Sequence, residues 1–175
     1  MNADIRYPIG RYQVVDFSNT EKESLMADIL FLPKLLEFAV LNLDESQLHL
    51  PYREGGWSAT QIIHHLADSH MNAFIRFKLA LTEENPIIKP YIQDKWGQTA
   101  DVLNVPVNIS ITLLHSLHHR WYELLKSMKD EDWNRTLHHP EQKRDIKLWE
   151  MLLIYAWHGK HHAAQITNLR EQQGW

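Results

Sequence analysis

Two histidines, His158 and His162, stand four residues apart within a helical apolar pattern. Residues at positions i and i+4 lie one turn apart on the same face of a helix. Two unpaired imidazoles in a core would be costly, and a divalent metal with one further ligand would remove that cost and leave a reactive coordination position. The rings are expected to point inward because the same face carries Leu148, Met151, Leu152, Tyr155, Ile166 and Leu169.

A third ligand would come from another helix, and the segment 58–81 offers His64, His65 and His70. At about 100° per residue, His65 falls beside Leu66 on the edge of the apolar stripe, and His70 points partly inward. His64 is expected to point toward solvent. The pattern therefore favours His65, with His70 as the alternative. Three neutral imidazoles and one exchangeable water are typical of catalytic rather than structural zinc.

The remaining histidines carry weaker signals. A histidine on an apolar face is often a core residue bonded to a neighbour, and this alternative applies to every candidate. His115 and His119 flank the apolar stripe of their helix and are expected on a solvated face. His118 lies in that stripe, where it could be a fourth ligand, an outer hydrogen-bond donor, a proton carrier or a packed ring near Trp121. The segment His138-His139-Pro140 is expected to be a loop.

Composition limits the class of protein. The 175 residues fit one domain, residues 1–175, with 44% apolar and 23% charged residues. A net charge of −4 gives no strong attraction to nucleic acid or to an anionic membrane. No apolar run is as long as a membrane span. Residues 1–10 lack the pattern of a signal peptide, so a cytoplasmic location is expected.

The chain contains no cysteine. A disulfide scaffold, a thiolate metal site and a cysteine nucleophile are therefore excluded, and any sulfur chemistry would arrive with a substrate. No glycine-rich phosphate loop is present. The pair His158 and His162 also lacks the glutamate that follows the first histidine in zinc proteases, because Gly159 stands there.

Four helical stretches must position these residues, and no alternating strand pattern is convincing. Two short links and one long connection, from about Glu83 to Val107, predict an all-α fold: a four-helix bundle with one long crossover connection. Such bundles build metal sites in their cores from facing helices. The predicted helices are about Thr20–Leu43, Ser58–Leu81, Asn108–Lys129 and Ile146–Gln172.

Local signals suggest where these helices begin and end. Ser18 with Glu21 and Thr20 with Glu23 both have the spacing of a capping box at the start of the first helix, and so does Ser58 with Gln61 at the start of the second. Asp145 is the expected N-cap of the last helix, and Gly174 stands just past its end. Pro33 is expected to kink or divide the first helix; the tryptophans are read as packing residues.

Several motifs resemble the DinB/YfiT-like family of metal-dependent hydrolases, most closely its YfiT subgroup, which is related to the bacillithiol S-transferases. They occur in the family's order with similar intervals and cover nearly the whole chain. The motifs are Tyr7-Pro8-Ile9-Gly10, Pro51-Tyr52-Arg53, Gly55-Gly56-Trp57-Ser58, His64-His65-Leu66-Ala67-Asp68-Ser69-His70-Met71-Asn72, Arg76-Phe77-Lys78, Arg120-Trp121, Trp157-His158, His161-His162 and Gly174-Trp175.

The resemblance implies a four-helix bundle, a homodimer, and one divalent ion per subunit held by three histidines. The family's first ligand is the histidine directly before leucine in the second-helix motif, which is His65 here, and the other two match His158 and His162. Zinc is the first expectation and nickel the second, since three imidazoles discriminate poorly between them.

The expected function is a metal-dependent hydrolase or small-thiol S-transferase acting on a small molecule, in which the ion activates water or a low-molecular-weight thiol. Asp68, Asn72 and Arg76 recur every four residues and could orient a ligand, although an ordinary polar helix face explains them as well. The alternative is a non-enzymatic dimeric helical protein with a structural metal, which a fourth protein ligand such as His118 would favour.

Overall fold

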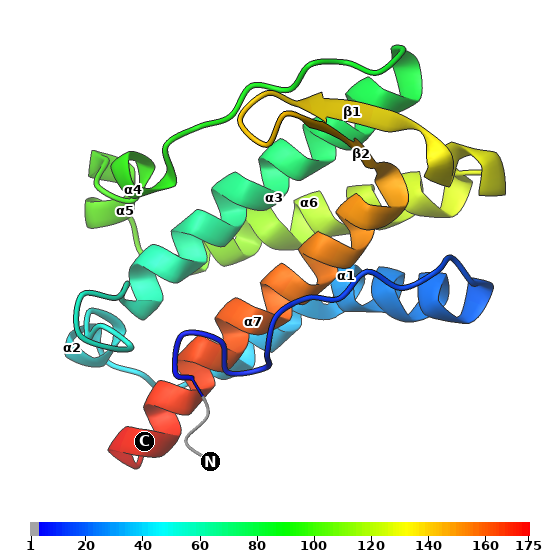
Figure 1. Cartoon of the computed structure of the whole chain (residues 1–175). Coiled ribbons are helices and arrows are strands. Elements are labelled where there is room, and N and C mark those ends of the chain that lie inside the picture. Colours follow the sequence, from blue (N-terminus) through cyan, green and yellow to red (C-terminus); the bar gives the residue numbers. More distant parts are fainter. Residues whose placement is uncertain (1–3) are drawn as a thin grey trace.

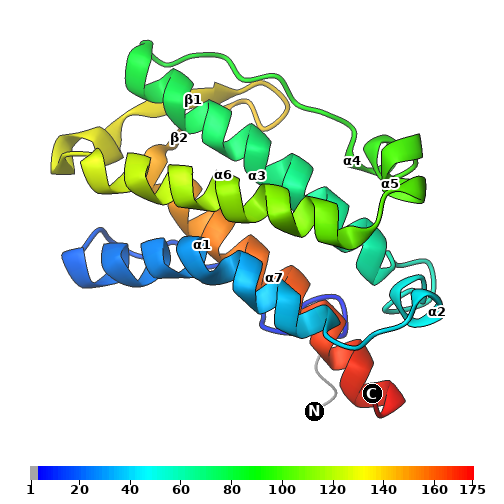
Figure 2. The same cartoon turned by 180° about the vertical axis from the view of Figure 1, so that it is seen from behind.

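Four long helices dominate the computed structural model, which describes residues 4–175. They lie side by side as a bundle (Figures 1 and 2), so the predicted fold class is confirmed. α1 and α3 each pack against both α6 and α7, which makes α1 and α3 diagonal partners. The four helices are α1 (Asn19–Val40), α3 (Ala59–Thr82), α6 (Val107–Ser127) and α7 (Leu148–Gln173).

The long connection has a topological cause. The colours of Figure 1 show α3 and α6 running in one direction, and α1 and α7 in the other. Because the neighbours α3 and α6 are parallel, residues 83–106 must return along the bundle, as the predicted crossover does. Two short helices, α4 (Gln93–Trp96) and α5 (Ala100–Asn104), lie within it, and α2 (Glu45–Leu48) lies between α1 and α3.

A small hairpin corrects the expectation of no strands. After a 3₁₀ turn at Asp130–Asn134, strand β1 (Thr136–His139) pairs antiparallel with β2 (Arg144–Lys147). The predicted loop His138-His139-Pro140 is therefore partly strand, and Asp145 faces His138 in the ladder instead of capping α7. Each strand has four residues, too few for a visible alternation, yet Leu137 and Ile146 are fully buried.

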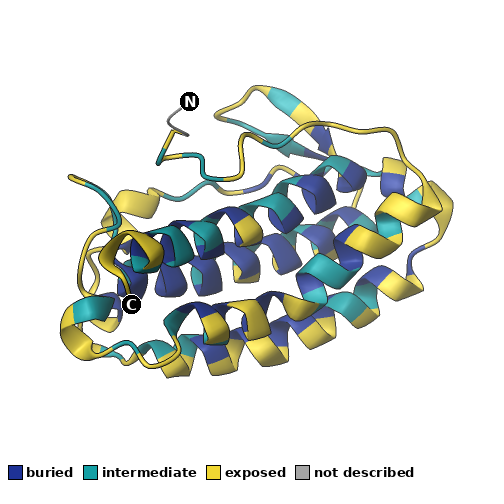
Figure 3. Cartoon of the chain, turned by 90° about the horizontal axis from the view of Figure 1, so that it is seen from below, coloured by how far each residue is buried: buried dark blue, intermediate teal, exposed yellow. Residues whose placement is uncertain are grey.

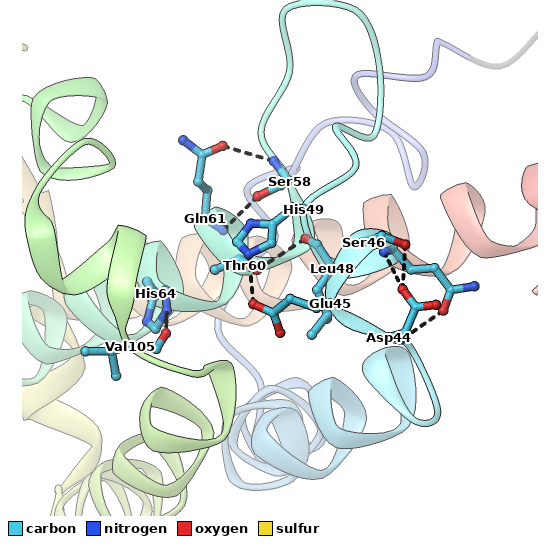
Figure 4. Close-up of polar contacts among 11 residues, drawn as sticks. Asp44, Glu45, Ser46, Leu48, His49, Ser58, Thr60, Gln61, His64 and Val105 are labelled. Atoms are coloured by element: carbon cyan, nitrogen blue, oxygen red, sulfur yellow. Dashed lines mark hydrogen bonds and ion pairs between the residues drawn. The ribbon is translucent and has the colours of Figure 1, made fainter.

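The helix ends follow the local signals elsewhere. The Ser18 hydroxyl accepts a hydrogen bond from the Glu21 amide at 3.2 Å, and Ser58 forms the predicted capping box with Gln61 (Figure 4). Gly174 ends α7 in the left-handed conformation with φ of 72°. Pro33 lies inside α1 without dividing it, and α1 ends at Val40, three residues before the predicted Leu43.

Burial follows the bundle: in Figure 3 the buried positions face inward between the helices and the exposed positions face outward. Two apolar clusters fill the interior, one around Trp121 and Phe77 and the other around Ile62 and Leu36. Along the helices, buried or partly buried histidines occupy the stretch where the two clusters meet. This histidine layer consists of His65, His70, His118, His158 and His162.

The N-terminal segment, residues 4–17, runs beside α7 (Figure 1). Three side chains on α7 donate hydrogen bonds to its carbonyls: Trp149 to Val15 at 2.7 Å, Trp157 to Gly10 at 3.0 Å and Gln165 to Arg6 at 3.2 Å. The donors are eight residues apart on α7 and meet carbonyls in reverse chain order, so the segment runs antiparallel to the helix. No helix among residues 4–175 is long and apolar enough to span a membrane.

Candidate metal centre

Three histidines from two helices converge in the histidine layer. His65 comes from α3, and His158 and His162 come from successive turns of α7. One potential ligand atom from each lies within 4.8 Å of the other two. The Nε2 atoms of His65 and His158 are 3.2 Å apart, and the His158 and His162 rings have centroids 4.6 Å apart.

These distances fit a divalent ion. Imidazole nitrogens bind zinc at about 2.0–2.1 Å, so two of them on one tetrahedral ion lie about 3.3 Å apart. The 3.2 Å between the His65 and His158 Nε2 atoms is close to that value. His65 is buried, whereas His158 and His162 are partly exposed, so the group is open on one side, as a site that exchanges ligands requires.

The protonation state also suits metal binding. Burial lowers the pKa of His65 to about 4 and that of His162 to about 3. Burial, followed by repulsion from neighbouring rings, holds the pKa of His158 well below its ordinary value. Since only neutral imidazole offers a lone pair, all three rings are ready to ligate at neutral pH.

Gln165 and Trp57 hold two of these rings in place. The Gln165 side-chain oxygen accepts a hydrogen bond from His162 Nδ1 at 2.8 Å, which leaves Nε2 of His162 free to face the group. The Gln165 amide nitrogen donates to the Arg6 carbonyl. Trp57 packs edge-on against His65, with centroids 4.7 Å apart, and parallel to His162. Sequence reasoning missed both roles, although Gln165 stands three residues after His162.

Gly159 has a steric reason for standing beside His158. A Cβ atom there would lie 2.5 Å from Cδ2 of Leu32 on α1, closer than real Cβ contacts. The small residue lets α7 approach α1 at the level of the candidate centre. It also accounts for glycine where zinc proteases carry glutamate.

His70, the alternative third ligand, lies outside this group of three. It is fully buried, and its Nε2 lies 3.2 Å from Nδ1 of His158, on the side of that ring away from His65. His118 is fully buried too and bonds to His70 and to the Ile29 carbonyl. His115 and His119 are exposed, as predicted, and His115 pairs with Glu37.

Comparison with known proteins identifies the family of the chain. Residues 31–166 match the DinB superfamily. The chain belongs to the DinB superfamily. This confirms the resemblance seen in the sequence motifs. A Bacillus mycoides protein named "Putative metal-dependent hydrolase" is 47% identical over 173 residues, covering 98% of this chain and 99% of the relative. A Geobacillus kaustophilus protein of the same description is 45% identical, with 98% and 97% covered.

A solved structure agrees with the fold of this DinB-superfamily chain. YfiT from Bacillus subtilis is described as a probable metal-dependent hydrolase with an unusual four-helix bundle topology. It superposes with a TM-score of 0.96 at 42% identity, covering 99% of each chain. The parallel neighbours α3 and α6, joined by a crossover, are a departure from a simple up-and-down bundle.

His64 of this DinB chain is not exposed, so that expectation was wrong. Its ring is buried, with Nε2 2.9 Å from the Val105 carbonyl (Figure 4). Its Nδ1 lies 2.7 Å from the Ser110 hydroxyl. The end of the crossover connection covers this face of α3, which would meet solvent in a bundle with direct loops. Burial lowers the pKa of His64, and the ring holds the crossover against α3.

The polar row on α3 makes structural contacts. Asn72 donates to the Asp68 backbone carbonyl at 2.9 Å, and Arg76 donates to the Tyr155 hydroxyl at 3.2 Å and to the Lys89 carbonyl at 3.3 Å. Burial, with a smaller contribution from Asp101, raises the pKa of Asp68 to about 6. The hydrogen bonds of Asn72 and Arg76 thus go to α3 itself, to Tyr155 of α7 and to the crossover rather than to the three histidines.

A cavity of about 350 Å³ adjoins the candidate centre. His162, Gln165 and Trp57 line it on one side, and Arg53 and Asp94 bring one charge of each sign to its wall. Asp94 belongs to the crossover connection. The crossover therefore helps to shape the space next to the histidines, which the sequence pattern gave no means to foresee.

Proposed function

We propose that this chain is a metal-dependent hydrolase acting on a small molecule, with His65, His158 and His162 holding one divalent ion. The convergence of these three imidazoles, with two Nε2 atoms 3.2 Å apart, is the observation that supports the proposal most. The description of two relatives as metal-dependent hydrolases supports hydrolysis as the reaction. Zinc is the first choice and nickel the second, since imidazole suits both.

The chain's own residues would position and shield the reacting groups. When bound, a divalent ion supplies Lewis acidity and lowers the pKa of a nucleophile such as water. Gln165 fixes the His162 ring, and Trp57 packs against both the His65 and the His162 rings. In the adjoining cavity, Arg53 and Asp94 offer opposite charges to a polar substrate.

Transfer of a low-molecular-weight thiol to an electrophile is the second candidate. The absence of cysteine is compatible with this reaction, because no internal thiol competes for the ion. The non-enzymatic alternative, a structural metal, would need a fourth protein ligand. His118, the residue considered for that role, uses its ring nitrogens on His70 and the Ile29 carbonyl.

We also propose that residues 1–175 form one domain that acts as a homodimer in the cytoplasm. The outer face of α1 exposes several large apolar side chains, which isologous association would cover. Phe31 and Phe38 are 63% and 58% exposed, and Leu35 and Leu41 accompany them.

Metal content and activity of matched variants test the function. Wild-type protein and the His65→Ala, His158→Ala and His162→Ala variants are purified, and bound metal is measured beside hydrolysis of an ester and amide panel and thiol transfer to a reporter electrophile. Each variant is expected to lose the metal and the activity, while the exposed His115→Ala retains both. Full metal occupancy in His162→Ala, or activity after verified metal removal, would contradict the proposal.

A further inference from the structure

Two buried rings, those of His70 and His118, continue a hydrogen-bonded chain behind His158. His158 Nδ1 lies 3.2 Å from Nε2 of His70, and His70 Nδ1 lies 3.0 Å from Nε2 of His118. His118 Nδ1 ends the chain on the Ile29 carbonyl. The four groups come from α7, α3, α6 and α1 in turn, so every long helix contributes one member.

We propose that His118 and His70 are positioning residues that fix the tautomer of His158, so that its Nε2 lone pair always faces the candidate metal centre. The purpose that we assign to these contacts, presenting His158 to a metal ion, rests on the proposed function. The hydrogen bonds themselves do not depend on it. We call the set Ile29, His118, His70 and His158 the tautomer chain.

The direction of every bond follows from the carbonyl end. A carbonyl oxygen only accepts, so His118 Nδ1 carries the proton. A neutral imidazole has one N–H, so His118 Nε2 must accept, and His70 Nδ1 must donate to it. By the same rule His70 Nε2 accepts from His158 Nδ1. The remaining nitrogen of His158, Nε2, is then unprotonated, and it is the atom that lies 3.2 Å from His65 Nε2.

The rule requires neutral rings, and the surroundings provide that. His70 and His118 are fully buried, and Trp121 and Tyr155 pack edge-on against His70 at centroid distances of 5.8 and 5.3 Å. An apolar, buried site disfavours the charged form of an imidazole, and burial lowers the pKa of His118 to about 4. In the part of the chain that the structure describes, no carboxylate is hydrogen-bonded to either ring to stabilise a charge.

Pro33 explains why the Ile29 carbonyl is available. In a regular α-helix that carbonyl would accept the amide N–H of residue 33, but proline has no N–H. Pro33 lies inside α1 and is buried. The helix thus leaves one inward carbonyl without its usual partner, and His118 takes that place.

The same end excludes a proton relay. A proton moving along the chain would have to leave through the Ile29 carbonyl, and an amide oxygen in a helix does not accept a proton at physiological pH. The chain therefore sets orientation and tautomer and carries no net proton flow. When no metal is bound, the proton between the facing Nε2 atoms of His65 and His158 must belong to His65, because His158 Nε2 carries no proton.

Nitrogen NMR of ¹⁵N-histidine-labelled protein tests the tautomers directly. In chelator-treated wild-type protein at pH 7.5, His118, His70 and His158 are expected as Nδ1–H and His65 as Nε2–H. Saturating zinc should leave the first three unchanged and move the His65 proton to Nδ1. An Nε2–H form of His158 in the metal-free protein would overturn the proposal, and this measurement needs no variant.

A substitution at the anchor tests the consequence for metal binding. His118→Phe is expected to give His158 a mixture of tautomers and to raise the zinc Kd, measured by chelator competition, by about 10–100-fold. The matched control is His64→Phe, which replaces another buried, hydrogen-bonded histidine outside the tautomer chain and should change neither quantity. An unchanged His158 tautomer and Kd in folded His118→Phe would overturn the proposal.

The two arms separate this inference from the proposed function. If wild-type protein bound no zinc, the proposed function would fail, while the metal-free spectrum would still decide the tautomers. If zinc bound to wild-type protein with His158 in the Nε2–H form before loading, the tautomer chain would fail and the metal site would stand.

Discussion

Acid should destabilise the metal-free protein at pH values well above those at which ordinary carboxylates titrate. A histidine whose pKa is lower in the folded than in the unfolded state binds a proton more readily after unfolding. Its stabilising contribution is therefore complete above the unfolded-state pKa, about 6.5, and is lost as pH falls toward the folded-state value. His65 and His118, both with pKa lowered to about 4 by burial, fall in this class, and so does His70, whose pKa burial holds well below its ordinary value.

The size of the effect follows from the shifts. With about 1.4 kcal/mol per pKa unit, His65 and His118 each lose about 2 kcal/mol of stabilisation between pH 7.5 and pH 5, or about 4 kcal/mol together. His70, His158 and His162 act in the same direction and are left out of this sum. Asp68, whose pKa burial raises, has the opposite sign and returns about 1.4 kcal/mol. The net loss of about 2.5 kcal/mol is a large fraction of the stability of an ordinary domain.

Guanidinium denaturation of chelator-treated protein, followed by circular dichroism at pH 7.5, 6.5, 5.5 and 5, measures this loss. The slope near pH 5.5 should correspond to at least about one more proton bound by the unfolded state. His118→Phe should reduce the loss by about 2 kcal/mol, while the exposed control His119→Asn should leave it unchanged. A free energy of unfolding that changes by less than about 1 kcal/mol between pH 7.5 and pH 5 would refute the reasoning.

Three further predictions follow from single contacts. Gln165→Leu removes the hydrogen bond to His162 Nδ1 and should raise the zinc Kd about tenfold or more in chelator competition; a wild-type Kd would contradict it. Ser58→Ala removes the N-cap of α3 and should lower the free energy of unfolding by about 1 kcal/mol, without changing the Kd. If α1 forms the dimer contact, Phe31→Glu with Phe38→Glu should give a monomer mass in light scattering where wild-type protein gives a dimer; an unchanged dimer would place the contact elsewhere.

The sequence was sufficient for the helices and for bringing the three histidines together, for physical reasons. His158 and His162 share a face with six apolar residues, and packing that face against the other helices turns both rings inward. His65 has the right phase on α3 by the same geometry. The caps at Ser18 and Ser58 were readable because capping uses side chains within three residues of each other.

The wrong predictions concern residues whose surroundings are set by parts of the chain far from them in sequence. His64 has the phase of an exposed residue, and only the return of the crossover across α3 buries it. Asp145 has a side chain suited to an N-cap, but it lies in β2, opposite His138 of the four-residue strand β1. Pro33 signals a helix defect, yet its effect on His118, 85 residues later, depends on how α1 and α6 pack. Helix periodicity contains no information about such long-range contacts.

The way residues 4–17 are held has a consequence for protein engineering. Trp149, Trp157 and Gln165 of α7 bind the segment through its carbonyl oxygens, which every amino acid supplies. The segment's own side chains can therefore be exchanged widely without removing these three bonds, provided that the backbone keeps its path. A fusion or deletion that displaces the backbone near Arg6 would disturb Gln165, and through Gln165 the ring of His162. An affinity tag is therefore better attached after Trp175 than before Arg6, because the backbone at Arg6 is hydrogen-bonded to Gln165.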